Sequence, residues 1–354
     1  MKKRYILLLL LASLSLVGCV STMTASPAPT VVASPLQSTA APVSTPTPSP
    51  TATSAPTPTK TPIPEPKLQW SFDAYALSSD AKAYLADREP DYRKLVDAVL
   101  QRQETVTLPK ASVIPSISCL YAEFPLSVVL RDFKVDKKGT TITLQYVFDQ
   151  TEHSSRIQAF AQRVESVIRE QVKARYNECE RALALYRWTA QNITYLDGND
   201  VTPYHALMEG VGICQSYEGV YRYLLLQVGI DARSGGAFTT DKAAHGWTLV
   251  HLNGAWYHMD PTFESGETLG AGLWYFGMDD VRREQSGVVQ PINTGIDDWC
   301  TQAPACEDAS FATLADCLAW EFDETAHRIL LYERNGTQPF AAFDTVTYSM
   351  TDVS

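Results

Sequence analysis

The chain has 354 residues, of which 45% are hydrophobic and 19% are charged, and its formal net charge is −11. This length allows one large globular domain or two modest ones. No extended cluster of Lys and Arg occurs after position 4. A nucleic-acid partner is therefore not expected, because neutralising phosphates requires many cations.

Residues 1–18 have the features of a signal peptide. Three basic residues precede an apolar run from Tyr5 to Leu16, which is too short to span a bilayer comfortably. The sequence LVGC follows, and small residues directly before a cysteine resemble the signal of a bacterial lipoprotein. The resemblance implies that Cys19 carries a lipid and that the protein lies at the extracytoplasmic face of the cell membrane. An ordinary secretory signal or an uncleaved anchor is the alternative.

Residues 19–66 predict a disordered tether behind the lipidated cysteine. Twelve of the 21 prolines fall here, among Ser, Thr, Ala and Val, and the only charges after Cys19 are Lys60 and Glu65. Such a segment lacks the apolar area that would offset its ordering entropy. We expect an extended tether that holds a globular unit away from a membrane.

Residues 67–150 predict a small mixed auxiliary region. The segment 91–103 has the apolar spacing of a helix, and 140–148 has the alternation and β-branched content of a strand. Cys119 has no base nearby in the sequence, so we interpret it as a buried structural thiol.

Two helices are expected next. Apolar residues recur at three- and four-residue steps over 154–176, and a second helix over 177–195 begins with Asn177 as its N-cap. Cys179 falls in the first turn of that helix, where the helix dipole favours a thiolate. It is therefore a rival candidate for a reactive thiol.

A further helix is predicted over 214–228, with Cys214 at its start. Gly210 and Gly212 allow the tight turn that precedes it, and Gly229 is suited to end it. A cysteine in this position faces unsatisfied N–H groups and the positive end of the dipole. It becomes a catalyst for amide chemistry only with a partner that serves as base and then as acid.

The partner is predicted from a hairpin turn at Asn253-Gly254, which pairs Leu252 with Ala255. In the same register His245 faces Thr262 and Trp247 faces Asp260. His245 and Asp260 are then diagonal neighbours on one face, roughly 7–8 Å apart at the backbone. At this distance the carboxylate can orient the imidazole.

The segments GVGICQSYEGVYRYLLLQVGI and HGWTLVHLNGAWYHMDPTF together resemble the transglutaminase-like superfamily. The resemblance covers about 177–276. It implies an α+β fold with a papain-like core, in which the nucleophile begins a helix packed on an antiparallel sheet. It also implies that Cys214 is the nucleophile, His245 the general base and acid, and Asp260 the residue that orients it. We place this catalytic core at 151–290 and a C-terminal extension with strands at 291–354.

The resemblance implies a thiol enzyme that acts on amide bonds of a protein or a cell-wall peptide, without a cofactor or metal. Hydrolysis and transfer to an amine both occur in the family, and we favour hydrolysis. A catalytically silent binding or scaffolding module with the same fold is the alternative. His251 and His258 share the predicted face with His245, so a zinc site is a second alternative.

Disulfide pairing stays open from the sequence. An exported chain can form disulfides, and Cys300 could pair with either Cys306 or Cys317.

Overall fold

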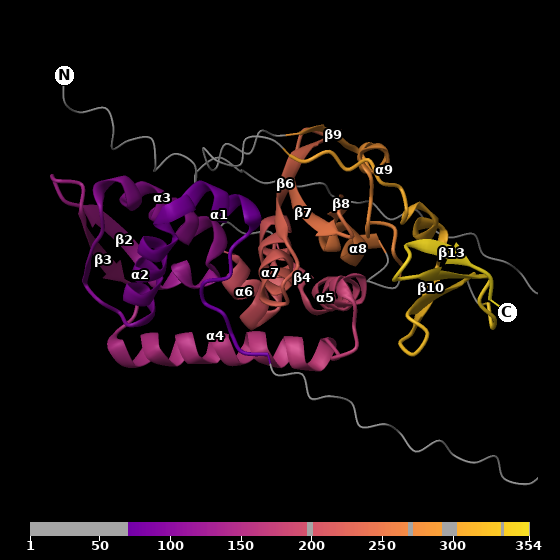
Figure 1. The fold of residues 1–354 in the computed structure, drawn as a ribbon, viewed down its shortest axis with the longest axis horizontal. Helices are drawn as coiled ribbons and strands as arrows, with labels where there is room; N and C mark the ends of the chain where they lie inside the picture. The colour runs from indigo at the N-terminus through magenta and orange to yellow at the C-terminus, as the bar shows by residue number, and fades with distance from the viewer. Residues whose placement is uncertain (1–69, 197–200, 268–271, 292–302, 334–335, 354) are drawn as a thin grey trace, which may run out of the picture. The chain divides into compact units, whose positions relative to one another are not determined.

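The computed structural model describes residues 70–196, 201–267, 272–291, 303–333 and 336–353 (Figure 1). The expected signal peptide, the lipidated Cys19, the tether and Cys300 lie outside the described residues. Within the described ranges, each helix is either too short or too polar to cross a membrane.

The N-terminal region combines three helices with a small antiparallel sheet. Its elements are α1 (Ser79–Leu85), α2 (Glu89–Leu100), β1 (Thr105–Thr107), α3 (Lys110–Glu123), β2 (Leu130–Val135) and β3 (Thr141–Tyr146), with strand order β1-β3-β2. The predicted helix at 91–103 is α2, and the predicted strand at 140–148 is β3. Cys119 lies in α3 and is fully buried, which agrees with a structural thiol.

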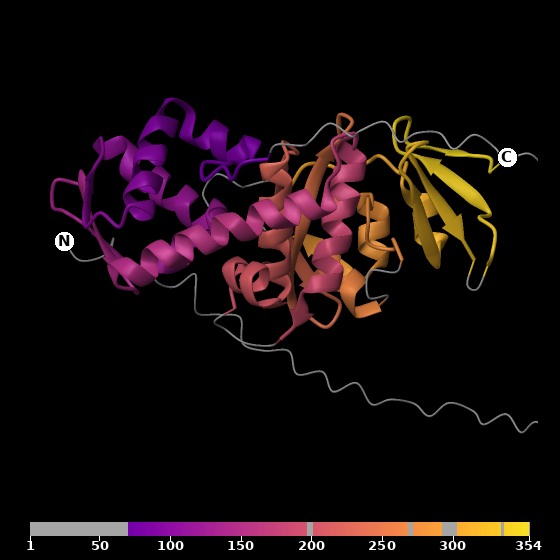
Figure 2. The same cartoon turned by 90° about the horizontal axis from the view of Figure 1, so that it is seen from below.

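Two long helices connect this region to the rest of the chain. Helix α4 (Gln150–Gln171) begins at its N-cap Asp149, and α5 (Glu178–Asn192) begins at Asn177 with a capping box. Figures 1 and 2 show α4 running from the N-terminal elements toward α5. The expected second helix ends earlier than predicted, because Thr194–Tyr195 forms β4, which pairs in parallel with β5 (Val211–Gly212).

The central sheet has the strand order β8-β7-β6-β9, and all its pairs are antiparallel. It consists of β6 (Ala232–Thr239), β7 (Ala244–Leu252), β8 (Ala255–Met259) and β9 (Val288–Pro291). Helix α7 (Cys214–Gln227) packs on β6 and β7, while α6 (Pro203–Glu209) packs on α7. Two shorter helices follow the hairpin, α8 (Pro261–Glu267) and α9 (Asp280–Gln285). The fold is therefore α+β, with a helix laid on an antiparallel sheet as the sequence predicts.

Residues from 319 onward form a third antiparallel sheet, β10-β11-β12-β13. Its strands are β10 (Ala319–Asp323), β11 (Arg328–Tyr332), β12 (Ala341–Asp344) and β13 (Ser349–Thr351). The alternating burial of β11 reflects one face, with Ile329 and Leu331, packed into the main core.

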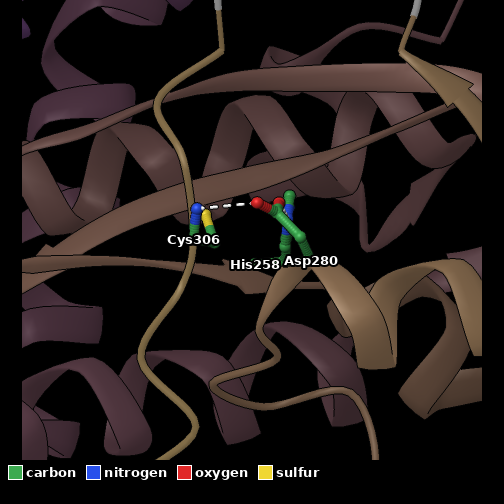
Figure 3. A group of neighbouring side chains, drawn as sticks. All are labelled: His258, Asp280 and Cys306. Atoms are coloured by element: carbon green, nitrogen blue, oxygen red, sulfur yellow. Dashed lines mark hydrogen bonds and ion pairs between the residues drawn. The ribbon is translucent and has the colours of Figure 1, made fainter.

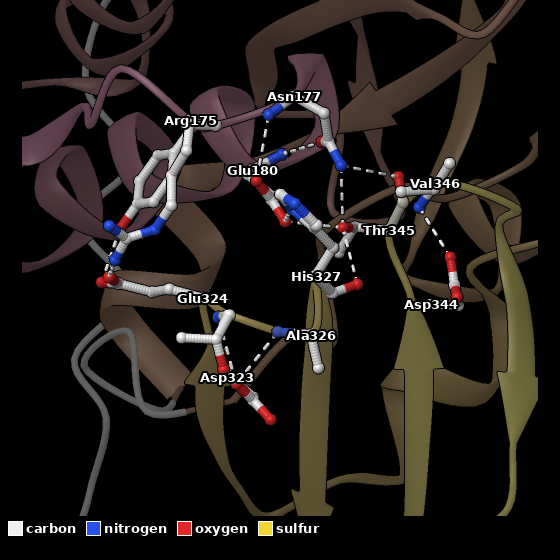
Figure 4. A network of polar contacts seen from close by, with 12 residues as sticks. Arg175, Asn177, Glu180, Asp323, Glu324, Ala326, His327, Asp344, Thr345 and Val346 are labelled. Atoms are coloured by element: carbon white, nitrogen blue, oxygen red, sulfur yellow. Dashed lines mark hydrogen bonds and ion pairs between the residues drawn. The ribbon is translucent and has the colours of Figure 1, made fainter. Parts of the chain in front are cut away.

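Polar contacts attach this sheet to the start of α5 (Figure 4). The buried carboxylate of Glu180 accepts hydrogen bonds from Nδ1 of His327 and from Oγ1 of Thr345, each over 2.8 Å. Oγ1 of Thr345 in turn accepts from Nδ2 of Asn177 over 2.9 Å. Glu324 forms ion pairs with Lys173 and Arg175, which lie in the segment between α4 and α5. The C-terminal strands are thus joined to the helix that leads toward the site.

Candidate active site

Cys214 is the first residue of α7, where the sequence predicts it. Gly210 has φ +70°, the left-handed conformation that favours glycine. A Cβ on Gly212 would lie 2.6 Å from Cβ of Ser216, so only glycine allows this close approach. Ser216 accepts from the backbone amide of Ile213 over 3.3 Å and donates to Val201 over 2.9 Å. These contacts fix where α7 starts, and Cys214 lies partly exposed at its positive end.

His245 lies on β7, and its partner lies at the end of the adjacent strand. The predicted register is found: Leu252 pairs with Ala255, and the ladder continues to Thr248 and Met259. The predicted pairs of Trp247 with Asp260 and of His245 with Thr262 do not form, because the chain turns into α8 after Asp260. The expected side-chain contact is present, with Nε2 of His245 2.6 Å from Oδ2 of Asp260.

Asp260 lies between the end of β8 and the start of α8, which explains the Asp-Pro-Thr-Phe motif. Its Oδ1 accepts the backbone amides of Thr262 and Phe263, each over 3.1 Å. This is the role of an N-cap, and Pro261 follows at the helix position where the missing N–H costs nothing. The carboxylate is therefore held by the start of a helix as well as by His245.

The environment of Asp260 keeps it ionised. Burial alone acts to raise the pKa of this carboxyl, since the group is fully inaccessible. His245 and Arg283 outweigh burial and hold the pKa well below its usual range. Nη1 of Arg283 lies 2.9 Å from Oδ2.

His245 is buried to 8% exposure and takes up a proton readily. Burial disfavours the imidazolium, but the Asp260 carboxylate and a hydrogen bond with Cys214 raise the pKa of His245 to about 9. The ring stacks on Phe263, with centroids 4.1 Å apart and planes 10° apart. Because Nε2 is bound to Asp260, Nδ1 is the nitrogen left to face the thiol of Cys214.

A cavity of about 1020 Å³ opens beside His245. Aromatic and polar residues line it, including Tyr195, Phe263 and Tyr275. The described residues around it include no Asp, Glu, Lys or Arg. The cavity therefore suits an uncharged segment of a substrate.

The rival thiol, Cys179, does not resemble a nucleophile in the structure. It is fully buried in α5, and burial, followed by the neighbouring Glu180, raises the pKa of its thiol far above the ordinary value. Cys306 and Cys317 are also buried free thiols. Cys214 is the partly exposed member among the cysteines that the structure describes.

The two histidines considered as zinc ligands beside His245 contact different residues. His251 packs on Trp256, 5.0 Å between ring centroids. His258 instead lies with Asp280 and Cys306, whose ligand atoms are all within 4.8 Å of one another (Figure 3). This second group has the composition of a metal site.

The hydrogen bonds of His258 oppose metal binding there. The indole Nε1 of Trp247 is 2.8 Å from Nδ1 of His258, and an indole can only donate. Nδ1 is therefore unprotonated, so the neutral ring carries its proton on Nε2 and donates it to Asp280 over 2.8 Å. A metal-bound histidine has the reverse arrangement, since its other nitrogen donates.

Sequence reasoning did not identify Arg283 or the stacking role of Phe263. Arg283 lies in the short helix α9, well after the predicted triad in the chain. Its one signal is the charge order of the segment DDVRREQ, in which two acidic residues precede two arginines, as is typical of a short helix.

The model of the transglutaminase-like superfamily matches residues 158–261. This match begins earlier than the resemblance identified in the sequence, within α4, and ends directly after Asp260. A comparison with curated proteins finds no match.

Three solved structures are similar to parts of the chain. A candidate cysteine protease from Cytophaga hutchinsonii is 16% identical, with a TM-score of 0.26, over 38% of this chain and 63% of that one. A TGase is 12% identical, with a TM-score of 0.27, over 44% of this chain and 48% of that one. LapG of Legionella pneumophila, treated with EGTA, is 15% identical, with a TM-score of 0.22, over 32% and 65%.

Each alignment spans less than two thirds of the solved protein. The family match, in contrast, covers the helix, hairpin and strand end that carry Cys214, His245 and Asp260. Residues 158–261 of this chain are a transglutaminase-like domain.

Proposed function

We propose that the protein is a thiol enzyme that cleaves or transfers amide bonds through a thioester on Cys214. The observation that carries the proposal is the 2.6 Å contact between His245 and Asp260, with His245 placed beside a cysteine at a helix N-terminus. A reactive thiol, a base and a group that orients the base are the parts that this chemistry requires.

In the proposed reaction His245 carries a proton in each of two steps. The thiol of Cys214 passes its proton to Nδ1 of His245, and Sγ attacks the amide carbonyl carbon. The C–N bond breaks as His245 returns the proton to the departing amine, which leaves a thioester. Water or a second amine then attacks the thioester and loses a proton to His245. The C–S bond breaks, and His245 returns this proton to the sulfur of Cys214. Asp260 stays ionised throughout and stabilises the imidazolium.

The negative oxygen of the tetrahedral intermediate needs donors near Cys214. The backbone N–H of Cys214 is among the first amides of α7, which have no carbonyl partner within the helix. We assign it as one donor to this oxygen.

The cavity beside His245 supports a neutral peptide segment of a protein or a cell-wall peptide as substrate. Its volume of about 1020 Å³ exceeds that of one side chain, and its lining carries aromatic and uncharged polar groups. We favour hydrolysis over transfer.

The test incubates the purified full-length protein with peptide substrates, with and without a labelled amine. New termini without label indicate hydrolysis, and incorporation of the label indicates transfer. We expect the C214A variant to be inactive in both reactions. Full activity of C214A on every substrate of the wild type would refute the proposal.

We also propose that a lipid on Cys19 anchors the enzyme at the extracytoplasmic face of the membrane. The basic start, the short apolar run and the LVGC sequence support this placement. Cells that produce the protein are given a radioactive fatty acid. Label is expected on the wild type and not on C19A, and equal labelling of both would contradict the anchor.

A further inference from the structure

Arg283 is a buried arginine whose contacts concentrate on the site. It is 3% exposed, and its Cζ lies 3.8 Å from the ring centroid of Trp247. Its Nε and Nη2 atoms have no hydrogen-bond partner among the described residues. A buried guanidinium is costly unless it is paired. The contact with Asp260 is its one ion pair in the part of the chain that the structure describes.

Arg283 and His245 bind the same oxygen of Asp260. Oδ2 is 2.9 Å from Nη1 of Arg283 and 2.6 Å from Nε2 of His245, while Oδ1 accepts two backbone amides of α8. Both oxygens are thus held in position. The positive charge of Arg283 also weakens the attraction of Oδ2 for the proton on His245.

Helix α9 is fixed at its start, so that Arg283 is held in place. The backbone N–H of Asp280 donates to the carbonyl of Cys306 over 2.8 Å, and the N–H of Cys306 donates to Oδ2 of Asp280 over 3.0 Å. Oδ1 of Asp280 accepts from His258 on β8. Figure 3 shows these three residues together. The family match ends at Pro261, so α9 is a part of this chain beyond it.

We propose that Arg283 is a positioning residue that fixes the Asp260 carboxylate and limits how firmly this carboxylate retains the proton on His245. The proposal rests on the proposed function, in which His245 gives its proton to the departing amine. A carboxylate without Arg283 holds the imidazolium more strongly, which makes His245 a weaker acid.

Other titratable groups also face the His245–Asp260 pair. Cys214 on α7 lies beside His245, and Tyr186 on α5 lies near Asp260. Glu264 on α8 lies beside Tyr186, and Tyr275, between α8 and α9, lies near Arg283. His258 is near through Trp247. Arg283 differs from all of these as the cation that donates to the carboxylate of Asp260.

The test measures how fast iodoacetamide alkylates Cys214 as a function of pH, with the full-length protein and detection of the Cys214 peptide by mass spectrometry. The rate rises at high pH when the imidazolium beside the thiolate loses its proton. In R283M we expect this rise to move upward by roughly one pH unit. R283K keeps the charge and is expected to return the rise toward the wild-type pH.

Arg282 provides a matched control in the same helix. It is also buried, but it donates to the backbone carbonyls of Phe311 and Leu273 and not to Asp260. We expect R282M to leave the pH of the rise unchanged. An unshifted rise in R283M, or an equal shift in R282M, would overturn the proposal.

If R283M alone does not fold, the same measurement is made on D260N and on the double variant R283M/D260N. The double variant lacks both the carboxylate charge and the arginine charge. The double variant R283M/D260N is expected to match D260N alone in the pH of the rise, because Arg283 acts through Asp260. If the rate of the double variant rises at a different pH from that of D260N, Arg283 does not act through Asp260. The alkylation rate can be measured without a substrate. Activity of C214A would therefore refute the proposed function, whereas the pH dependence of alkylation tests the role of Arg283 separately.

Discussion

His245 and Asp260 share a hydrogen bond of 2.6 Å, and both side chains are buried. The pair links the stability of the fold to pH. The folded pKa of His245 is about 9, above the ordinary value of 6.5 for a histidine. Its contribution to stability is therefore fully present below pH 6.5 and is lost as the pH rises through 9.

We therefore expect the free energy of unfolding to fall between pH 6.5 and 9 by about 2–3 kcal/mol through this group. Urea denaturation at a series of pH values measures it. H245Q, which keeps an amide donor toward Asp260 but does not titrate, serves as the control and should lose less. An equal loss in both proteins would show that other groups set the pH dependence.

At low pH the direction reverses, and Asp260 is the group concerned. Its folded pKa is depressed, so its contribution to stability is present above the ordinary value of 3.8 for an aspartate and is lost as the pH falls through the folded pKa. Comparison of wild type with D260N in urea below pH 4 measures this. The two stabilities should converge as the pH falls, and a constant difference would contradict the assignment.

Cys214 should be alkylated at neutral pH roughly tenfold or more faster than a thiol in an unstructured peptide. The reason is its position at the start of α7 beside a histidine that readily accepts a proton. H245A should reduce the rate toward that of the peptide. A wild-type rate no higher than that of the peptide would instead favour the catalytically silent module.

Zinc is not expected to bind at His258, Asp280 and Cys306. Trp247 donates to Nδ1 of His258 and so keeps the proton of the ring on Nε2, the nitrogen that a zinc ion would need. The melting temperature of C214A, measured with excess zinc and with a chelator, should be the same. The C214A background removes the other thiol that could bind zinc next to a histidine. A bound ion at a hundred times its Kd would add about 2.7 kcal/mol, and a rise of that size would refute the tautomer argument.

T345V should destabilise the protein by roughly 1–3 kcal/mol, because Glu180 loses a donor and Asn177 loses an acceptor inside the core. T347V is the matched control, since this threonine is exposed on the same turn, and it should change stability by less than about 0.5 kcal/mol. Chemical denaturation of both variants checks the prediction. Equal stabilities would mean that the contacts of Thr345 contribute nothing.

The helices and the hairpin near the site could be predicted because their signals are local. Asn177 is a strong N-cap, and the Asn253-Gly254 turn sets a register that carries through to Thr248 and Met259. That register brings the start of β7 near the end of β8, and the turn into α8 then places Asp260 against His245. The resemblance to the family was needed for the nucleophile, because a cysteine at a helix start also occurs as Cys179.

The remaining parts depend on contacts distant in the sequence. Arg283 reaches Asp260 across a loop whose path no local pattern indicates. The 194–195 segment continues an apolar helical pattern but forms a strand. The carbonyls of Gly210 and Gly212 accept the backbone amides of Thr194 and Leu196. Here tertiary hydrogen bonding outweighs helix propensity.

Glu180 takes two of its hydrogen-bond donors, His327 and Thr345, from residues 147 and 165 positions further along the chain. Its other carboxylate oxygen accepts the backbone amide of Asn177 within the capping box of α5. The start of α5 is therefore complete only when the C-terminal strands have folded against it. We expect the helix that leads toward the site and the C-terminal sheet to unfold together, in one cooperative transition.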